Sequence, residues 1–134
     1  GSFAPTAVRW GRDNRTCALR LVGNGAGLRL ENRVPGGDVN PYLAVSGIIA
    51  AGLDGIKKKM VLEPAFKGNA YDSDSARVPA TMSEALTLWE ESAGVKEVFG
   101  AEVQSHYANM ARVEIAAYSK AVTDWELFRN FERF

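Results

Sequence analysis

The sequence is 134 residues long, with sixteen basic and sixteen acidic side chains, 46% hydrophobic residues and 24% charged ones. This length predicts one soluble globular domain or a piece of one. The balanced charge provides no field that would attract nucleic acid or an anionic membrane, so any anion site must be local. One cysteine, Cys17, excludes an intramolecular disulfide, and no apolar run is long enough to span a bilayer. We therefore expect a cytoplasmic protein with no nucleic-acid or membrane partner.

The first forty residues predict short strands. The stretches "TCALRLV" (16–22) and "LRLENRV" (28–34) read as strands, and the glycines of "GNGAG" between them permit a tight connection. We expect these stretches to form an antiparallel hairpin within about residues 14–35. The connection lacks the Gly-Lys-Ser/Thr ending of a phosphate-binding P-loop, and no helix follows it directly, so that interpretation is rejected.

Helices are predicted for most of the remaining chain. The first helix is predicted to begin with Asn40 as N-cap and Pro41 as its first helical residue. Apolar residues occur on nearly every side of this helix, which predicts that it is buried on most sides. Prolines and glycines predict a loop over 61–80. Further helices are predicted from the capping pattern at 81–92, the amphipathic stretch 101–122 and the aromatic-rich tail after Thr123, whose aromatic residues are expected to dock on a core or a partner. Short strands packed against several helices predict the α+β class.

Three other features have ordinary explanations. His106 is the only histidine and has no partner at metal-ligand spacing, so we expect it to be a surface or packing residue. Cys17 has no local base and is not expected to act as a nucleophile. The lysines of 57–59 are expected to complement the dipole at a helix end, rather than to form a phosphate site.

The charged residues of the hairpin are the candidates for chemistry. Arg29, Glu31 and Arg33 occupy alternate positions, so an extended chain points all three to one face, and Arg15 and Arg20 lie on the neighbouring strand candidate. Arginine holds phosphate or carboxylate through paired N–H donors, and a carboxylate beside bound phosphates is a natural Mg²⁺ or Mn²⁺ ligand. From charge pattern alone, an exposed strand with ordinary ion pairs is the preferred interpretation, because such pairs are common and nearly neutral in energy.

The surrounding motifs change this judgement. The stretches "NRTCALR" and "RLENRVPGGDVNPYLAVSGIIAAGLDGI" contain Asn-Arg-Thr followed by an arginine five residues on, then Arg-x-Glu-x-Arg, Asn-Pro-Tyr-Leu and Ala-Gly-Leu-Asp-Gly-Ile. In order and spacing they resemble the C-terminal part of the glutamine synthetase family, and the resemblance covers nearly the whole chain. It implies that 1–134 is a single C-terminal segment of the catalytic domain, without the N-terminal β-grasp domain and the first part of the catalytic domain. Gly1-Ser2 has the form of a cloning remnant.

The resemblance also implies roles for individual residues. The family activates L-glutamate with ATP to form γ-glutamyl phosphate, which ammonia or a larger amine then attacks. Glu31 would be a ligand of the divalent metal, Mg²⁺ or Mn²⁺, and Arg20 and Arg29 would contact nucleotide phosphates. Arg15 would contact the transferring phosphoryl group, and Arg33 the substrate glutamate or the phosphoryl group. Family sites form between subunits of a dodecamer-like homo-oligomer, so the isolated segment is expected to be inactive.

Departures from the family pattern leave the nitrogen donor open. Pro35 is followed by Gly36-Gly37 and only then by Asp38, where mainstream members have Asp directly after the proline. This form looks more like the branch that makes γ-glutamyl derivatives of polyamines or ethanolamine. The alternatives are an ordinary glutamine synthetase that uses ammonia and a non-catalytic relative with a structural role. Tyr71 falls where some members carry an adenylylated tyrosine, but the flanking proline-rich pattern is missing, so we expect a loop residue.

Overall fold

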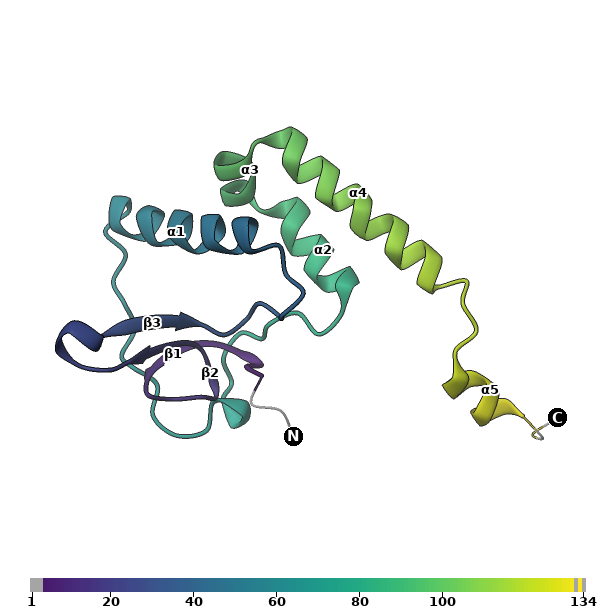
Figure 1. Ribbon diagram of the computed structural model, residues 1–134, viewed down its shortest axis with the longest axis horizontal. Coiled ribbons are helices and arrows are strands. Elements are labelled where there is room, and N and C mark those ends of the chain that lie inside the picture. The colour runs from purple at the N-terminus through teal and green to yellow at the C-terminus, as the bar shows by residue number, and fades with distance from the viewer. Residues whose placement is uncertain (1–3, 132, 134) are drawn as a thin grey trace. The chain divides into compact units, whose positions relative to one another are not determined.

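The computed structural model describes residues 4–131 and 133, and the chain divides into two compact units between Ala80 and Thr81 (Figure 1). Gly1-Ser2 and Phe134 lie outside the described residues. The first unit contains β1 (Ala7–Arg12), β2 (Cys17–Val22), η1 (Gly25–Gly27), β3 (Arg29–Asn32), α1 (Pro41–Lys57) and η2 (Ala70–Asp72). The second contains α2 (Met82–Glu91), α3 (Ala93–Phe99), α4 (Ala101–Tyr118) and α5 (Asp124–Asn130). The α+β class is confirmed.

The described strands form one mixed sheet in the order β1-β2-β3. Strands β2 and β3 pair antiparallel, which confirms the predicted hairpin. Their register sets Arg20 opposite Glu31 and Val22 opposite Arg29. Directly opposite residues of an antiparallel pair project to the same face of the sheet, so this register decides which charges can meet.

Strand β1 was not predicted from the sequence. It pairs in parallel with β2, with Ala7 opposite Cys17, and only residues 13–16 connect the two strands. The buried positions of β1 are the small residues Ala7 and Gly11, so its hydrophobic alternation is weak. Gly11 is required by close packing, because a Cβ there would lie 2.9 Å from the Cβ of Asn14 and 3.1 Å from the Sγ of Cys17.

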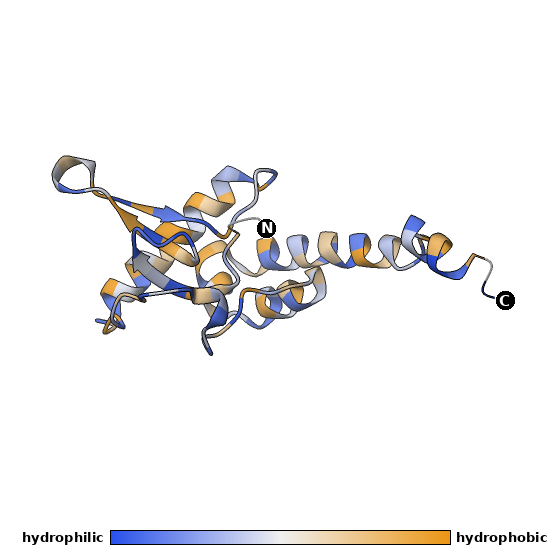
Figure 2. Cartoon of the chain, turned by 90° about the horizontal axis from the view of Figure 1, so that it is seen from below, coloured by the Kyte–Doolittle hydropathy of each residue, from blue (hydrophilic) through white to orange (hydrophobic). Residues whose placement is uncertain are grey.

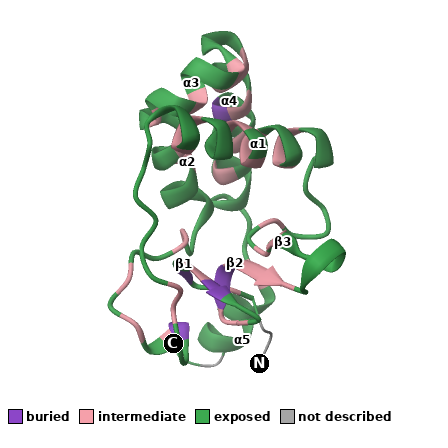
Figure 3. Cartoon of the chain, turned by 90° about the vertical axis from the view of Figure 1, so that its left-hand side faces the viewer, coloured by how far each residue is buried: buried purple, intermediate pink, exposed green. Residues whose placement is uncertain are grey.

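The core of the first unit is small and lies where β1, β2 and the 61–80 segment meet. Ala7, Cys17 and Ala70 are fully buried, and Phe66 packs against them; Figure 3 shows the buried positions in β1 and β2. The 61–80 segment, predicted as a loop, follows the free edge of β1. The Val8 N–H donates to Ala76 O at 2.8 Å, and the Phe66 N–H donates to the main-chain oxygen of Trp10 in β1 at 2.9 Å. The segment therefore closes the edge that β1 would otherwise expose.

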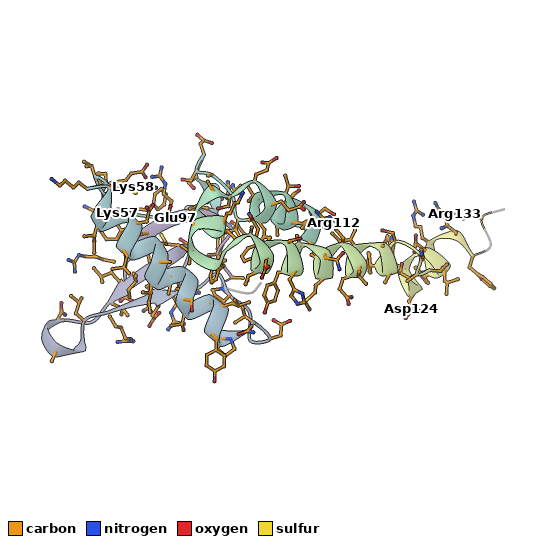
Figure 4. The ribbon with its side chains drawn as sticks, turned by 90° about the horizontal axis from the view of Figure 1, so that it is seen from above. Lys57, Lys58, Glu97, Arg112, Asp124 and Arg133 are labelled. Atoms are coloured by element: carbon orange, nitrogen blue, oxygen red, sulfur yellow. The ribbon has the colours of Figure 1, made fainter. Side chains whose placement is uncertain are left out.

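Helix α1 begins as the sequence predicts. The side-chain oxygen of Asn40 accepts hydrogen bonds from the N–H groups of Tyr42 at 3.0 Å and Leu43 at 3.3 Å. Its C-terminal end carries Lys57 and Lys58 (Figure 4), and Lys58 Nζ lies 2.7 Å from Asp54 Oδ2. The predicted burial on most sides is wrong for this chain, since α1 contains no buried residue.

The second unit is built around the contact between α2 and α4. The Trp89 indole N–H donates to Gln104 O at 2.9 Å, and Gln104 Nε2 donates back to Trp89 O at 2.7 Å. The Trp89 ring lies 5.8 Å from that of Phe99 and 6.2 Å from that of Tyr107, measured between centroids. Helix α3, which supplies Phe99, was not predicted separately. Ser92 ends α2 and caps α3 by accepting from the Val95 N–H at 3.1 Å.

Helix α5 begins with the predicted capping box. The Thr123 hydroxyl accepts from the Glu126 N–H at 3.2 Å, and the Glu126 carboxylate accepts from the Thr123 N–H at 2.8 Å. Apolar stretches are visible along α5 in Figure 2. Trp125 is 68% and Phe128 82% exposed, so the docking expected for these aromatic side chains does not occur within the described residues.

Candidate functional site

Glu31 lies at the centre of the charged face of the hairpin. Arg20 Nη1 donates to Glu31 Oε2 at 2.9 Å, and Arg29 Nη2 donates to Glu31 Oε1 at 3.1 Å. The first contact crosses from β2 to β3, and the second joins alternate residues of β3. Each oxygen of one carboxylate thus accepts from a different guanidinium. The alternating pattern of the sequence predicted the shared face of Arg29 and Glu31, and the strand register brings Arg20 to it.

These contacts keep Glu31 ionised. The hydrogen bond from Arg20 is the main cause that lowers the pKa of the Glu31 carboxyl below its usual value, and the charges of Arg20 and Arg29 act in the same direction. Partial desolvation opposes them and is outweighed. Hydrogen bonds to Asp13 and to Glu31 in turn raise the pKa of the Arg20 guanidinium. The face therefore carries full charges of both signs at neutral pH.

Exposure increases across the cluster from Arg20 to Arg29. The Arg20 side chain is 12% exposed, Glu31 29% and Arg29 61%. Arg29 is thus the member with most freedom to turn toward a bound anion, while Arg20 is held inside. The Nε–H of Arg20 is buried and has no acceptor among the described residues.

Arg15 does not join the cluster. It is exposed in the turn before β2, which begins at Cys17, so its predicted place on the strand is wrong. Asn14 forms this turn, because its side-chain oxygen accepts from the Thr16 N–H at 3.0 Å and from the Thr16 hydroxyl at 2.7 Å. Arg15 in this turn therefore makes no contact with Glu31 in β3.

Arg33 lies one residue beyond β3 and continues its pairing. Its main-chain N–H donates to Ala18 O at 2.9 Å, and its side chain is half-buried. Because it is two residues from Glu31 on extended chain, it shares the face of the cluster. Of the residues predicted for the site, Arg20, Arg29 and Glu31 are in direct contact, and Arg33 lies beside them.

Asp13 belongs to the cluster although sequence reasoning missed it. Its carboxylate accepts a hydrogen bond from Arg20 Nη2. Asp13 lies in the short connection after β1, and a single aspartate in a polar turn carries no signal of its own. Only the parallel pairing of β1 with β2 brings it beside Arg20.

The donor chemistry of the cluster fits a divalent metal in type but not in number. Glu31 offers carboxylate oxygens, which Mg²⁺ and Mn²⁺ prefer. Each oxygen accepts one hydrogen bond and retains a lone pair. Within the described part of the chain, however, no three His, Cys, Asp or Glu side chains gather as a metal site. Glu31 can supply one ligand, and a complete site would need others.

The remaining candidates have structural roles or none. Burial is the main cause that raises the pKa of the Cys17 thiol, so the side chain stays protonated in the core and is a poor nucleophile. His106 is exposed on α4, with its ring 5.3 Å from that of Tyr107. Tyr71 lies in η2, and its hydroxyl is buried. None of the described helices has the length and apolar content needed to cross a membrane.

Comparisons with known proteins identify the family of this chain. The model of the glutamine synthetase catalytic domain matches residues 1–130. The chain is 64% identical to gamma-glutamylethanolamide synthetase GlnA4 of Streptomyces coelicolor over 133 residues, which are 99% of this chain and 29% of that protein. It is 39% identical to glutamate–isopropylamine ligase of a Pseudomonas species, over 98% of this chain and 29% of that protein.

Solved structures show the same fold. A structure described as a GmaS/ADP complex matches with a TM-score of 0.84 at 29% identity, over 97% of this chain and 30% of that chain. An apo GmaS structure matches with a TM-score of 0.82. The chain therefore spans less than a third of the length of these proteins.

Proposed function

Because the chain belongs to the glutamine synthetase family, we propose that it is the C-terminal segment of the catalytic domain of an ATP-dependent glutamate–amine ligase. The longer polypeptide forms a γ-glutamyl amide through γ-glutamyl phosphate, with its β-grasp domain and the first part of its catalytic domain outside this segment. The observation that carries the proposal is the Glu31 carboxylate held between the guanidinium groups of Arg20 and Arg29. The isolated segment is inactive, because one charged face is only part of a site.

The charged face suits phosphoryl transfer. Such transfer depends on positioning and on stabilising negative charge, which fixed arginines supply without covalent chemistry. Arg29, the most exposed of the three, turns from Glu31 toward a phosphate oxygen of ATP, and Arg20 supports the phosphates from the buried side. Arg33 holds the substrate glutamate or the transferring phosphoryl group. Arg15 reaches the same group from the turn that Asn14 forms.

Glu31 is one ligand of a divalent cation, Mg²⁺ or Mn²⁺. Such an ion, when bound, neutralises phosphate charge beside the arginines. Glu31 would hold the ion through its carboxylate, with Arg20 keeping that carboxylate in place through its hydrogen bond to Oε2. The remaining ligands come from the part of the polypeptide outside this segment. The active site lies between subunits of a homo-oligomer, as in the family.

We further propose that the nitrogen donor is an amine larger than ammonia. Two relatives support this, since the names of both refer to organic amines, with ethanolamide formation in one and isopropylamine in the other. A second candidate is ammonia, because glutamine synthetases are also among the relatives, for example that of Thermus thermophilus at 33% identity. A non-catalytic relative is the third alternative, and it predicts that metal ligands outside this segment are missing.

Amine-dependent phosphate release tests the proposal in the longer enzyme. We expect turnover with glutamate, ATP and ethanolamine or isopropylamine, and much weaker turnover with ammonia. Mass spectrometry of the γ-glutamyl product identifies which amine was incorporated. Strong activity with ammonia alone would make the enzyme an ordinary glutamine synthetase, and no phosphate release with any amine would favour the non-catalytic alternative.

A further inference from the structure

We propose that Asp13 is a positioning residue, whose carboxylate fixes the Arg20 guanidinium so that Arg20 in turn holds Glu31 in place for a metal–nucleotide complex. The inference rests on the proposed function and deepens it. It adds a residue from outside the hairpin motif, located on the connection between β1 and β2.

Arg20 is held by two contacts at opposite ends of its guanidinium. Nη1 donates to Glu31 and Nη2 donates to Asp13. The third nitrogen, Nε, is buried and makes no hydrogen bond within the described residues. The plane of the group is therefore set by Glu31 and Asp13 together. With Asp13 removed, one contact remains, and the group can rotate about it.

The backbone of Asp13 is fixed to the strand that carries Arg20. The Asp13 N–H donates to Leu21 O at 2.9 Å, which continues the pairing of β1 with β2 by one residue. Asp13 also adopts a φ of 46°, in the left-handed region that Asp and Asn tolerate better than most residues. Its carboxylate is consequently presented to Arg20 from a defined point, although the side chain is 73% exposed.

Asp13 also offsets positive charge in the cluster. Arg20 and Arg29 contribute two positive charges and Arg33 lies on the same face, while Glu31 and Asp13 contribute two negative charges. Without Asp13, Glu31 is the one anionic partner left to Arg20 among residues 4–131 and 133, and Arg20 competes more strongly with a metal ion for that carboxylate. Asp13 thus acts through Arg20. Its loss is expected to weaken binding of the cation–nucleotide complex more than binding of glutamate.

Two substitutions separate the parts of this role. Asp13→Gly removes the carboxylate and tolerates the positive φ. Asp13→Asn also tolerates that φ and keeps a hydrogen-bond acceptor while removing the charge. Glu63→Gln is the matched control, because Glu63 forms an ion pair with Arg9 on the same sheet and has no contact with Arg20.

The first measurement reads Arg20 directly. In the 134-residue chain, ¹⁵N relaxation and hydrogen exchange of the Arg20 Nε–H group report the order of the guanidinium without any nucleotide or metal. We expect faster exchange and a lower order parameter in Asp13→Gly, an intermediate result in Asp13→Asn, and no change in Glu63→Gln. An Arg20 signal unaffected by Asp13→Gly overturns the proposal.

The second measurement uses the longer enzyme. We expect Asp13→Gly to raise the KM for the ATP–metal complex about tenfold, at the low end of the effect of losing an outer partner of a metal ligand. The KM for glutamate stays unchanged, and Asp13→Asn recovers part of the loss. A purely structural role would instead affect both KM values or only the stability of the enzyme. If Asp13→Gly disorders the Arg20 side chain but leaves the KM for the ATP–metal complex unchanged, the positioning role is also overturned.

The proposed function fails in a different way. If Arg20→Ala leaves turnover intact, Arg20 does not serve the reaction, and Asp13 has no positioning role in it, whatever the NMR measurement shows. If Arg20→Ala abolishes turnover while Asp13→Gly leaves every kinetic constant unchanged, the proposed function survives and the Asp13 inference alone is wrong.

Discussion

Arg20 and Glu31 face each other across the β2–β3 hairpin and are joined by a hydrogen bond of 2.9 Å. This one contact links the buried and the open sides of the cluster, since Arg20 also binds Asp13 and Glu31 also binds Arg29. The register of two short strands therefore determines which charges form the candidate site. This arrangement, and the packing that supports it, should therefore respond to substitutions in specific ways.

Removing the central carboxylate should stop the reaction of the longer enzyme. We expect Glu31→Ala to reduce ATP-dependent phosphate release on the order of 100-fold or more, similar to the loss of one electrostatic stabiliser in other active sites. The control is Glu114→Ala, on an exposed position of α4. Near-normal turnover of Glu31→Ala would remove Glu31 from the metal site.

Replacing Arg29 by lysine should separate its charge from its geometry. Lysine keeps the positive charge but cannot offer paired, planar N–H donors to a phosphate. We expect Arg29→Lys to raise the KM for ATP about tenfold with little effect on the KM for glutamate. Because the Arg29 side chain is 61% exposed, thermal unfolding should be unchanged. An unaltered KM for ATP would contradict a phosphate contact.

The supporting sheet should be sensitive at Gly11. A Cβ at this position would lie 2.9 Å from Asn14 Cβ, 3.0 Å from Phe66 O and 3.1 Å from Cys17 Sγ, so the strand or the 61–80 segment must shift. We expect Gly11→Ala to lower the free energy of unfolding by about 1–3 kcal/mol, measured with urea. Gly27→Ala is the control, since nothing lies within 4 Å of its added Cβ. Equal stability of the two variants would show that the packing at Gly11 is not tight.

The α5 capping box should respond to pH. The hydrogen bond from the Thr123 backbone is the main cause that lowers the pKa of Glu126 below its usual 4.5, with help from the Thr123 hydroxyl. The ionised carboxylate thus stabilises the helix start above pH 4.5, and this stabilisation is lost as the pH falls through the lowered pKa.

NMR titration of the Glu126 carboxyl provides the measurement. We expect a midpoint below 4.5 in the native chain and an upward shift in Thr123→Ala, which removes the hydroxyl contact. Thr81→Ala removes the N-cap of α2 and should leave the Glu126 titration unchanged. A midpoint at or above 4.5 in the native chain would exclude the capping interaction in solution.

Local chemistry explains what could be predicted from the sequence. Asn40 before Pro41 predicts the start of α1, and Thr123 with Glu126 predicts the start of α5, because caps depend on residues two or three positions apart. The alternation of Arg29 and Glu31 predicts a shared face for the same reason, since the period of a strand is local. The motifs around this face also identified the family correctly.

Contacts between distant segments decided the rest. Strand β1 pairs through small residues such as Ala7, which carry little hydrophobic signal, and its free edge is closed by a segment more than fifty residues away. That parallel pairing is what brings Asp13 to Arg20. The sequence by itself determined the capped starts of α1 and α5, the charged alternation and the family. Only the tertiary structure decided that Arg15 stands apart from Glu31 and that Asp13 joins its cluster, because both depend on how β1 returns to β2.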